Sequence, residues 1–188
     1  MKSYARLALI ASFALLTFRH SAQASLLLEP YLGYVTGGQI KSAPLDAKYT
    51  GTEYGARVGY SIMNFAVGGE YLAKTLTDDS SPSSNTYTGG DLGIFAAFKF
   101  PILVRAFATY VPSPELKSSN SLGSSTFKSG NILKLGVGFT ALPFININLE
   151  YISGTYSKIN TNGIEANLQN NLTTTAYALS VSAPFTLF

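Results

Sequence analysis

Apolar side chains alternate with small or polar ones along about eight stretches of this chain, each roughly ten residues long. In the stretch 53–62, Tyr54, Ala56 and Val58 take alternate positions with Gly55 and Arg57. Comparable stretches cover 28–35, 65–72, 91–100, 104–110, 133–140, 145–151 and 176–185. Successive side chains of a strand point to opposite faces, so each stretch is predicted to be a two-faced strand in an all-β fold.

The first 24 residues have the features of a secretory signal. Lys2 and Arg6 precede an apolar run over 7–18, and the small residues Ala22 and Ala24 suit a signal peptidase. The run has about twelve residues, whereas a spanning helix needs roughly twenty, so a retained anchor is disfavoured. We therefore predict a signal peptide over 1–24 and a single domain over 25–188.

Removal of this signal changes the chemistry of the chain. Three of the 13 basic residues lie in it, namely Lys2, Arg6 and Arg19, which leaves 13 − 3 = 10 basic residues against 10 acidic ones. The single histidine, His20, is also lost, and the chain has no cysteine. A neutral domain without a basic run gives no sign of a nucleic-acid partner.

The alternation alone does not say which face lies outside, because a soluble lipocalin-like barrel has the same pattern with its apolar side chains inside. The faces without large apolar residues carry many glycines and only isolated charges, which suits a cramped interior. Only 12% of the residues are charged, about half of the roughly 25% of soluble domains. Both observations favour a barrel whose apolar face meets lipid.

Turn lengths and tyrosine positions also favour a membrane barrel. Short turns are predicted near Asn64, Pro101 and Pro143, and they alternate with predicted long loops over 37–51, 75–89, 112–130 and 153–173. Six tyrosines fall near the long-loop ends of the apolar faces, where an interfacial aromatic girdle would lie. They are Tyr34, Tyr54, Tyr71, Tyr110, Tyr151 and Tyr177.

The pattern over 25–188 resembles the small eight-stranded outer-membrane barrels, the superfamily of the OmpA transmembrane domain and OmpX. The resemblance rests on three strands: Leu28-Glu29-Pro30-Tyr31-Leu32-Gly33-Tyr34, Gly55-Ala56-Arg57-Val58-Gly59-Tyr60 and Leu133-Lys134-Leu135-Gly136-Val137-Gly138-Phe139. It implies an eight-stranded antiparallel up-and-down transmembrane β-barrel in the outer membrane of a Gram-negative cell. It further implies surrounding outer-membrane lipid, insertion by the barrel-assembly machinery, and a monomer.

The isolated charges on the inner faces form the candidate site. They are Glu29, Glu53, Arg57, Glu70, Asp91, Lys99, Arg105, Lys134 and Glu150. Charges in a narrow lumen must be paired or hydrated, because an isolated buried charge costs several kcal/mol. We predict a paired network with two open interpretations: a polar core that fills the barrel, or a gate of Arg57 or Arg105 against Glu53 or Glu150. The bulky inward residues Tyr31, Phe95 and Phe107 favour a filled lumen.

Enzymatic barrels of this architecture use a histidine as base, and the domain over 25–188 has none. We therefore predict no enzymatic activity and no cofactor. Asp78-Asp79 supplies too few ligands for a metal. The predicted role is structural, or surface interaction with an unidentified extracellular ligand through four extracellular loops. A narrow pore for small solutes and a soluble lipocalin-like lipid binder are the alternatives.

Overall fold

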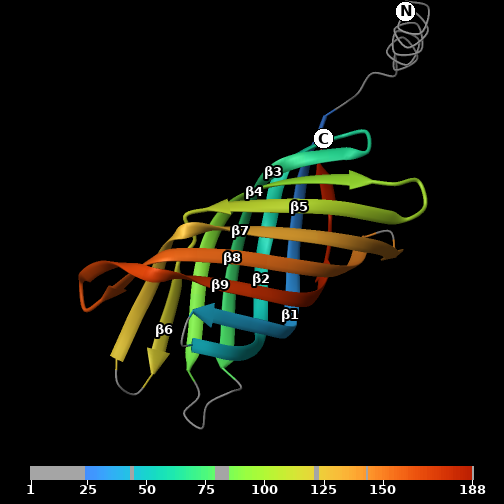
Figure 1. Ribbon diagram of the computed structural model, residues 1–188. Helices are drawn as coiled ribbons and strands as arrows, with labels where there is room; N and C mark the ends of the chain where they lie inside the picture. Colours follow the sequence, from blue (N-terminus) through green and yellow to red (C-terminus); the bar gives the residue numbers. More distant parts are fainter. Residues whose placement is uncertain (1–23, 43–44, 79–84, 121–122, 143, 188) are drawn as a thin grey trace, which may run out of the picture.

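The computed structural model describes residues 24–42, 45–78, 85–120, 123–142 and 144–187, so almost all of the predicted signal peptide lies outside the described residues. Strands make up nearly all of the described chain (Figure 1). They are β1 (Ser25–Ser42), β2 (Leu45–Ile62), β3 (Phe65–Asp78), β4 (Thr86–Lys99), β5 (Val104–Pro112), β6 (Leu116–Asn120), β7 (Gly123–Leu142), β8 (Ile145–Thr161), β9 (Ile164–Ser182) and β10 (Phe185–Leu187). Among the described residues, no helix is long and apolar enough to cross a bilayer.

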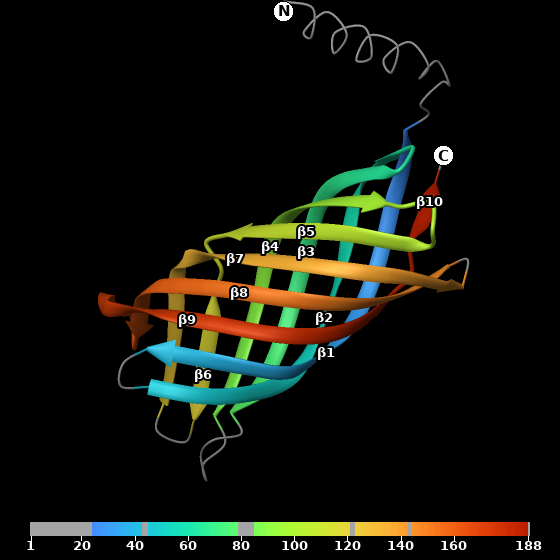
Figure 2. The ribbon, with the colours of Figure 1, turned by 45° about the vertical axis from the view of Figure 1, so that its right-hand side comes forward.

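Eight strands close into an antiparallel barrel. They follow the order β1, β2, β3, β4, β5, β7, β8 and β9, and β9 pairs back with β1. The short strand β6 takes the place of β5 between β4 and β7 at one end of the barrel. At the other end β10 pairs with the start of β1, close to the C-terminus (Figure 2). The predicted eight-stranded antiparallel barrel is confirmed.

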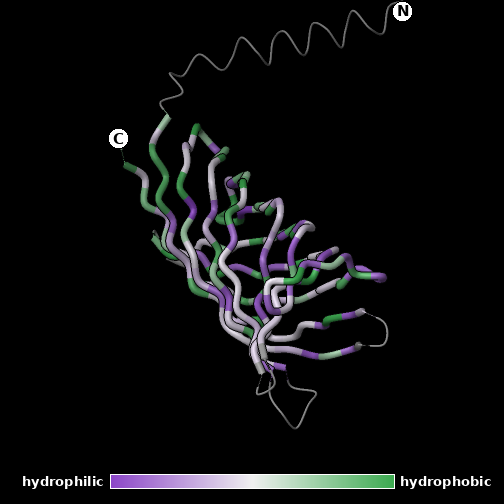
Figure 3. Tube along the Cα trace, turned by 90° about the vertical axis from the view of Figure 1, so that its left-hand side faces the viewer, coloured by the Kyte–Doolittle hydropathy of each residue, from purple (hydrophilic) through white to green (hydrophobic). Residues whose placement is uncertain are grey.

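Apolar side chains cover the outside of the barrel. Hydrophobic and hydrophilic residues alternate along the strands (Figure 3), and the large apolar ones are solvent-accessible. Leu92 is 72% exposed, Ile94 66% and Leu32 63%. The six predicted girdle tyrosines are likewise exposed. A contiguous apolar exterior of this kind suits a lipid surrounding and is incompatible with a soluble lipocalin-like barrel.

One end of the barrel has tight turns. Met63 adopts a φ of 55° between β2 and β3, and Leu103 a φ of 62° between β4 and β5. The Lys99 amide donates to the Asn64 carbonyl at 2.8 Å, which ties the two turns together. The short turns predicted near Asn64 and Pro101 are thus confirmed, while Pro143 lies outside the described residues. We call this end of the barrel the short-turn end.

The prediction of four long loops is wrong in extent. Most of 37–51, 75–89, 112–130 and 153–173 is strand, so four hairpins extend the barrel at the end opposite the short turns. Apolar residues still alternate within these Ser/Thr-rich segments, and Ile40, Tyr49, Leu76 and Tyr87 point inward and are buried. This inward packing stabilises extended hairpins where composition alone indicated loops. We call this end the extended end.

Candidate functional site: a charged lumen beneath an apolar cap

Eight of the nine charged residues that the sequence singled out lie inside the barrel. Their exposed fractions run from 0% to 7%. These eight are Glu29, Glu53, Arg57, Glu70, Asp91, Arg105, Lys134 and Glu150. They come from seven strands, and each points inward because it shares the strand face opposite the apolar exterior.

Lys99 is the exception. It is the last residue of β4, it is exposed, and it forms no ion pair within the described part of the chain. Its register partner on β5 is Arg105, which is also a cation. Alternation identifies the face of the sheet but not the depth along the barrel, and Lys99 lies at the mouth, where water reaches it. Its inclusion in the network was wrong.

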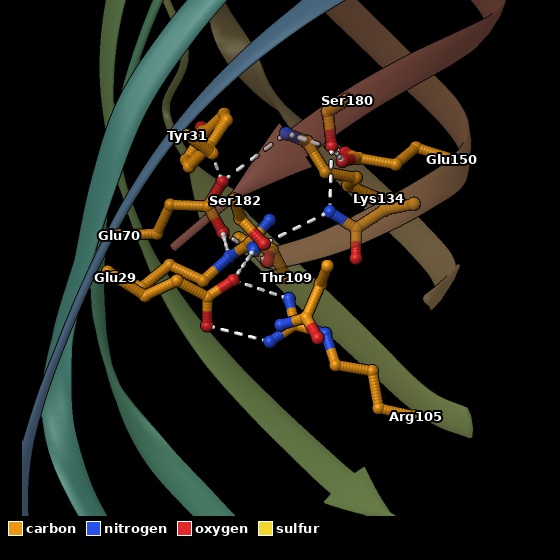
Figure 4. A network of polar contacts seen from close by, with 12 residues as sticks. Glu29, Tyr31, Glu70, Arg105, Thr109, Lys134, Glu150, Ser180 and Ser182 are labelled. Carbon is orange, nitrogen blue, oxygen red and sulfur yellow. Dashed lines mark hydrogen bonds and ion pairs between the residues drawn. The ribbon is translucent and has the colours of Figure 1, made fainter. Parts of the chain in front are cut away.

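Glu29 joins the two arginines of the network. Arg57 Nη1 donates to Glu29 Oε1 at 2.9 Å. Arg105 holds the same carboxylate with both terminal nitrogens, Nη1 to Oε2 at 2.7 Å and Nη2 to Oε1 at 2.5 Å (Figure 4). Bidentate charge-assisted pairs are the strongest of protein hydrogen bonds, and they fix the planar guanidinium in one orientation.

Glu70 is the second centre of the network. Arg57 Nε donates to it at 3.0 Å, and the hydroxyls of Tyr31 and Thr109 donate at 2.6 Å and 2.5 Å. Lys134 Nζ completes the set at 3.3 Å from Oε1 (Figure 4). Both carboxylate oxygens are therefore bound, which offsets the cost of removing the charge from water.

Lys134 links Glu70 to the remaining acids. Its Nζ lies 3.2 Å from Glu53 Oε1 and 3.0 Å from Glu150 Oε2. Ser180 donates a short hydrogen bond to Glu150, and Asn148 donates to Ser180 at 3.0 Å. The network thus continues from β1 round the lumen to β9.

Aromatic rings fill the space between the charges. The Arg57 guanidinium lies between Tyr31 and Phe107, 4.6 Å and 4.3 Å from the two ring centroids. Gly136 makes room for the second ring, because a Cβ there would fall 2.1 Å from Phe107 Cζ. Such stacking adds cation–π attraction between the guanidinium and the two rings.

Sequence reasoning missed a further ion pair, Lys74–Asp91. Lys74 Nζ lies 2.9 Å from Asp91 Oδ2 and donates to the Tyr156 hydroxyl at 3.3 Å. Asp91 also accepts the Glu115 amide at 2.8 Å. The predicted strand ended at Leu72, and one more step of the alternation from Glu70 and Leu72 would have included Lys74.

An apolar cap fills the barrel at the extended end. We use this name for the buried cluster of Val35, Ile40, Tyr49, Leu76, Tyr87, Leu116, Tyr156, Leu172, Ala176 and Ala178. Burial raises the pKa of Tyr156, so its phenol stays neutral where it accepts the hydrogen bond from Lys74. A cavity of about 30 Å³ lies where the cap meets Glu53 and Lys74. This space is enough for one or two waters and does not form a channel.

The short-turn end is hollow instead. A cavity of about 420 Å³ there reaches Glu29 and Arg105, and Lys99 and Asn146 contribute to its walls. Among the described residues, this cavity extends from the short-turn end to the charged network and stops there. Within the described ranges, no group of three or more His, Cys, Asp or Glu side chains is placed to hold a metal ion. Asp78 is buried in β3, and Asp79 lies outside the described residues.

Comparison with known proteins gives similarity at the level of structure. No protein-family model matches the chain, and no curated protein sequence matches it significantly. Neisserial surface protein A has a TM-score of 0.62 and 18% identity, with 87% of this chain and 99% of that chain covered. Ail of Yersinia pestis, in complex with the heparin analogue sucrose octasulfate, has a TM-score of 0.57 and 14% identity, with 85% and 99% covered.

These likenesses establish the fold. The chain is a small eight-stranded barrel of the outer-membrane type, as its resemblance in sequence pattern implied. Its apolar exterior and tyrosine girdle are those of an outer-membrane protein. At identities of 18% and 14% the comparison carries no further information on activity.

Proposed function

We propose that the protein is a non-enzymatic outer-membrane barrel whose closed lumen supports a structural or surface-interaction role of the extended hairpins. The extended end faces the cell exterior in this proposal, and the short turns face the periplasm. Outer-membrane lipid surrounds a monomer that the barrel-assembly machinery inserts. The observation that carries the proposal is the apolar cap, because it joins residues of all four hairpins into one platform.

The hairpin surface suits a polar partner that binds through hydrogen bonds. Two of its lysines are already paired, Lys128 with Glu115 at 3.1 Å and Lys158 with Glu165 at 2.7 Å. The exposed residues from 161 to 171 are mostly amides, hydroxyls and small side chains. Ail binds a polysulfated molecule in its solved complex. The paired lysines here favour instead a partner of low charge.

A photoreactive residue at the hairpin tip tests this role. We would place benzoylphenylalanine at Asn162 in the β8–β9 turn and irradiate intact cells that express the protein. Adducts with proteins or surface polysaccharides are expected at Asn162. Leu92, which is 72% exposed on the apolar exterior, is the matched control and should give lipid adducts only. Absence of any non-lipid adduct at Asn162 and at a second tip position, Asp46, would count against the surface role.

The alternative function is a narrow pore, and the hollow short-turn end favours it. Conduction would require both the charged network and the apolar cap to open. We expect a folded but silent protein in planar bilayers, and replacement of Arg57 by Ala should leave it silent because the cap remains. Discrete conductance steps in the unaltered protein would overturn the closed-lumen proposal and support the gate.

A further inference from the structure

The cavity at the short-turn end is hollow because the inward side chains there are small. Its lining includes Ser61, Ala66, Ala97 and Thr140, each on the inner face of its strand. One step deeper, on the inner faces of β4 and β5, the bulky rings of Phe95 and Phe107 fill the lumen. The volume of about 420 Å³ lies in the range of small-molecule sites. We call this cavity the vestibule.

The C-terminal strand closes the vestibule beside β1. The Ala183 amide donates to the Pro30 carbonyl at 3.0 Å, and β10 then pairs with the start of β1 (Figure 2). Thr186 lies opposite Leu27 in this pairing, and both residues line the vestibule. Leu27 is buried and adds an apolar surface to the small side chains of the other strands. Paired strands thus form these walls, so the vestibule is preformed.

Two cations face each other at the vestibule. Lys99 is the last residue of β4, and Arg105 lies directly opposite it on β5. Both residues line the vestibule. Like charges in directly opposed positions repel and destabilise a pair of strands. An anion held between the two side chains would replace this repulsion by attraction.

Glu29 is the one acidic residue among the described residues that line the vestibule, and it is already paired. Its Oε1 accepts from Arg57 Nη1 at 2.9 Å, and both of its oxygens accept from Arg105. Glu29 therefore does not compensate Lys99, which forms no ion pair within the described part of the chain. The charges of Lys99, Arg105 and Glu29 sum to 2 − 1 = +1. Apolar walls focus the field of such a charge, so the vestibule attracts anions.

The chemistry of the walls narrows the class of anion further. The Asn146 oxygen accepts the Thr140 hydroxyl at 2.8 Å, so Asn146 offers a ligand its Nδ2 donor and not an acceptor. Leu27 and Ala97 offer only apolar contact. A hydrated inorganic anion gains nothing from these two residues, whereas an organic anion with a compact apolar body removes apolar surface from water against them. The vestibule therefore suits a small organic carboxylate.

We propose that the vestibule binds a small organic carboxylate, with the anionic group beside Lys99 and Arg105 and the apolar body against Leu27 and Ala97. In the orientation given by the proposed function, this ligand enters from the periplasm. The binding itself depends neither on that orientation nor on the partner of the hairpins. It is a second binding function, at the end of the barrel opposite the hairpins.

A titration followed by the amide resonances of the protein in lipid nanodiscs tests this binding. The probes are naphthoate, its uncharged analogue naphthamide, and inorganic phosphate. We expect naphthoate to shift the amide resonances of Leu27, Ala97 and Lys99. It should bind about tenfold more tightly than naphthamide, the factor that one charge-assisted hydrogen bond gives. Phosphate should bind more weakly than naphthoate, because it makes no apolar contact.

Two variants separate the charge of the vestibule from its space. Lys99→Gln should lower the affinity for naphthoate about tenfold and leave that for naphthamide unchanged, since it removes a cation outside the buried network. Ala97→Trp should weaken the binding of both probes by filling the vestibule. Lys117→Gln, on exposed β6 at the extended end, is the matched control and should bind naphthoate as the unaltered protein does.

Heat-modifiable migration on a gel shows that each variant is folded, so a failure of this proposal is distinct from a failure of the barrel. An unchanged naphthoate affinity in folded Lys99→Gln protein would overturn the proposal. Equal affinities for naphthoate and naphthamide, or phosphate binding as tight as that of naphthoate, would overturn it as well. Shifts confined to exterior residues such as Leu92 would show partition into lipid and would have the same consequence.

Discussion

Two layers of the same lumen are filled by opposite chemistry. In the middle of the barrel, four carboxylates (Glu29, Glu53, Glu70 and Glu150) interlock with the three cations Arg57, Arg105 and Lys134. Toward the extended end, the apolar cap closes the barrel through contacts among hydrophobic side chains. The lipid-facing strands hold the charged layer, whereas the hairpins themselves bring the cap together.

This difference predicts different responses to damage. Each charge of the middle layer has been removed from water, so loss of a partner leaves a buried charge without compensation. Loss of an apolar side chain leaves a cavity, whose cost depends on how far the neighbours relax. Within the cap, β6 pairs with β4 over three residues, so the hairpin of β6 and β7 can relax further than the strands around the middle layer.

Arg57→Met should have the largest effect on stability. The change removes ion pairs to both Glu29 and Glu70 and leaves two carboxylates underpaired in a dry layer. We expect a loss of about 3–5 kcal/mol in the free energy of unfolding, measured by urea titration in detergent micelles. Lys117→Gln on exposed β6 should stay within about 0.5 kcal/mol. A folded Arg57→Met protein of unaltered stability would show that the middle layer is hydrated rather than dry.

The two layers also differ in how far they could be predicted from the sequence. Period-two alternation identified the strands, the barrel and its exterior, because it depends only on neighbours along the chain. It also placed isolated charges such as Arg57 and Glu70 on the inner face. It could not give depth along the barrel, which is why Lys99 was misassigned, and the predicted end of β3 was too early to include Lys74.

The apolar cap was missed for a different reason. Its residues, such as Ile40, Leu116 and Leu172, stand singly among Ser, Thr and Asn, so composition indicated loops. Their partners are on other hairpins, far away in sequence, and a window along one strand carries no sign of that packing. The alternation that continues through these segments was the available signal.

Leu116→Ala in the cap should have a smaller effect than Arg57→Met. Leu116 is 1% exposed, and its truncation leaves a cavity in the cluster. Buried Leu→Ala changes cost about 2–5 kcal/mol, and we expect the lower end, because β6 can move inward. Faster amide exchange should be confined to β6 and to 123–127 of β7. Ile164→Ala, at a position 75% exposed, is the control and should change neither quantity. Exchange that also increased at Arg57 and Glu70 would mean that the two layers unfold together.

The smallest effect is expected at the hairpin tip, where an ion pair has the chemistry of the middle layer but not its surroundings. Lys158 Nζ donates to Glu165 Oε1 at 2.7 Å, and this hydrogen bond, aided by the charge of Lys158, lowers the pKa of Glu165. A carboxyl whose pKa is lower in the folded state stabilises that state above its unfolded pKa, and the contribution is lost as pH falls through the folded pKa. Because Glu165 is solvent-exposed, water screens the pair and the stability gain is small.

Carbon-detected NMR titration of the Glu165 carboxyl measures this pKa directly. It should rise toward the ordinary glutamate value in Lys158→Gln, and also at about 1 M salt, where the screening length falls to roughly 3 Å. The urea midpoint at neutral pH should hardly move in either case. A large loss of stability in Lys158→Gln would mean that the tip pair supports the cap. The stability that an ion pair contributes would then depend more on the charge pairing itself than on its position in the barrel.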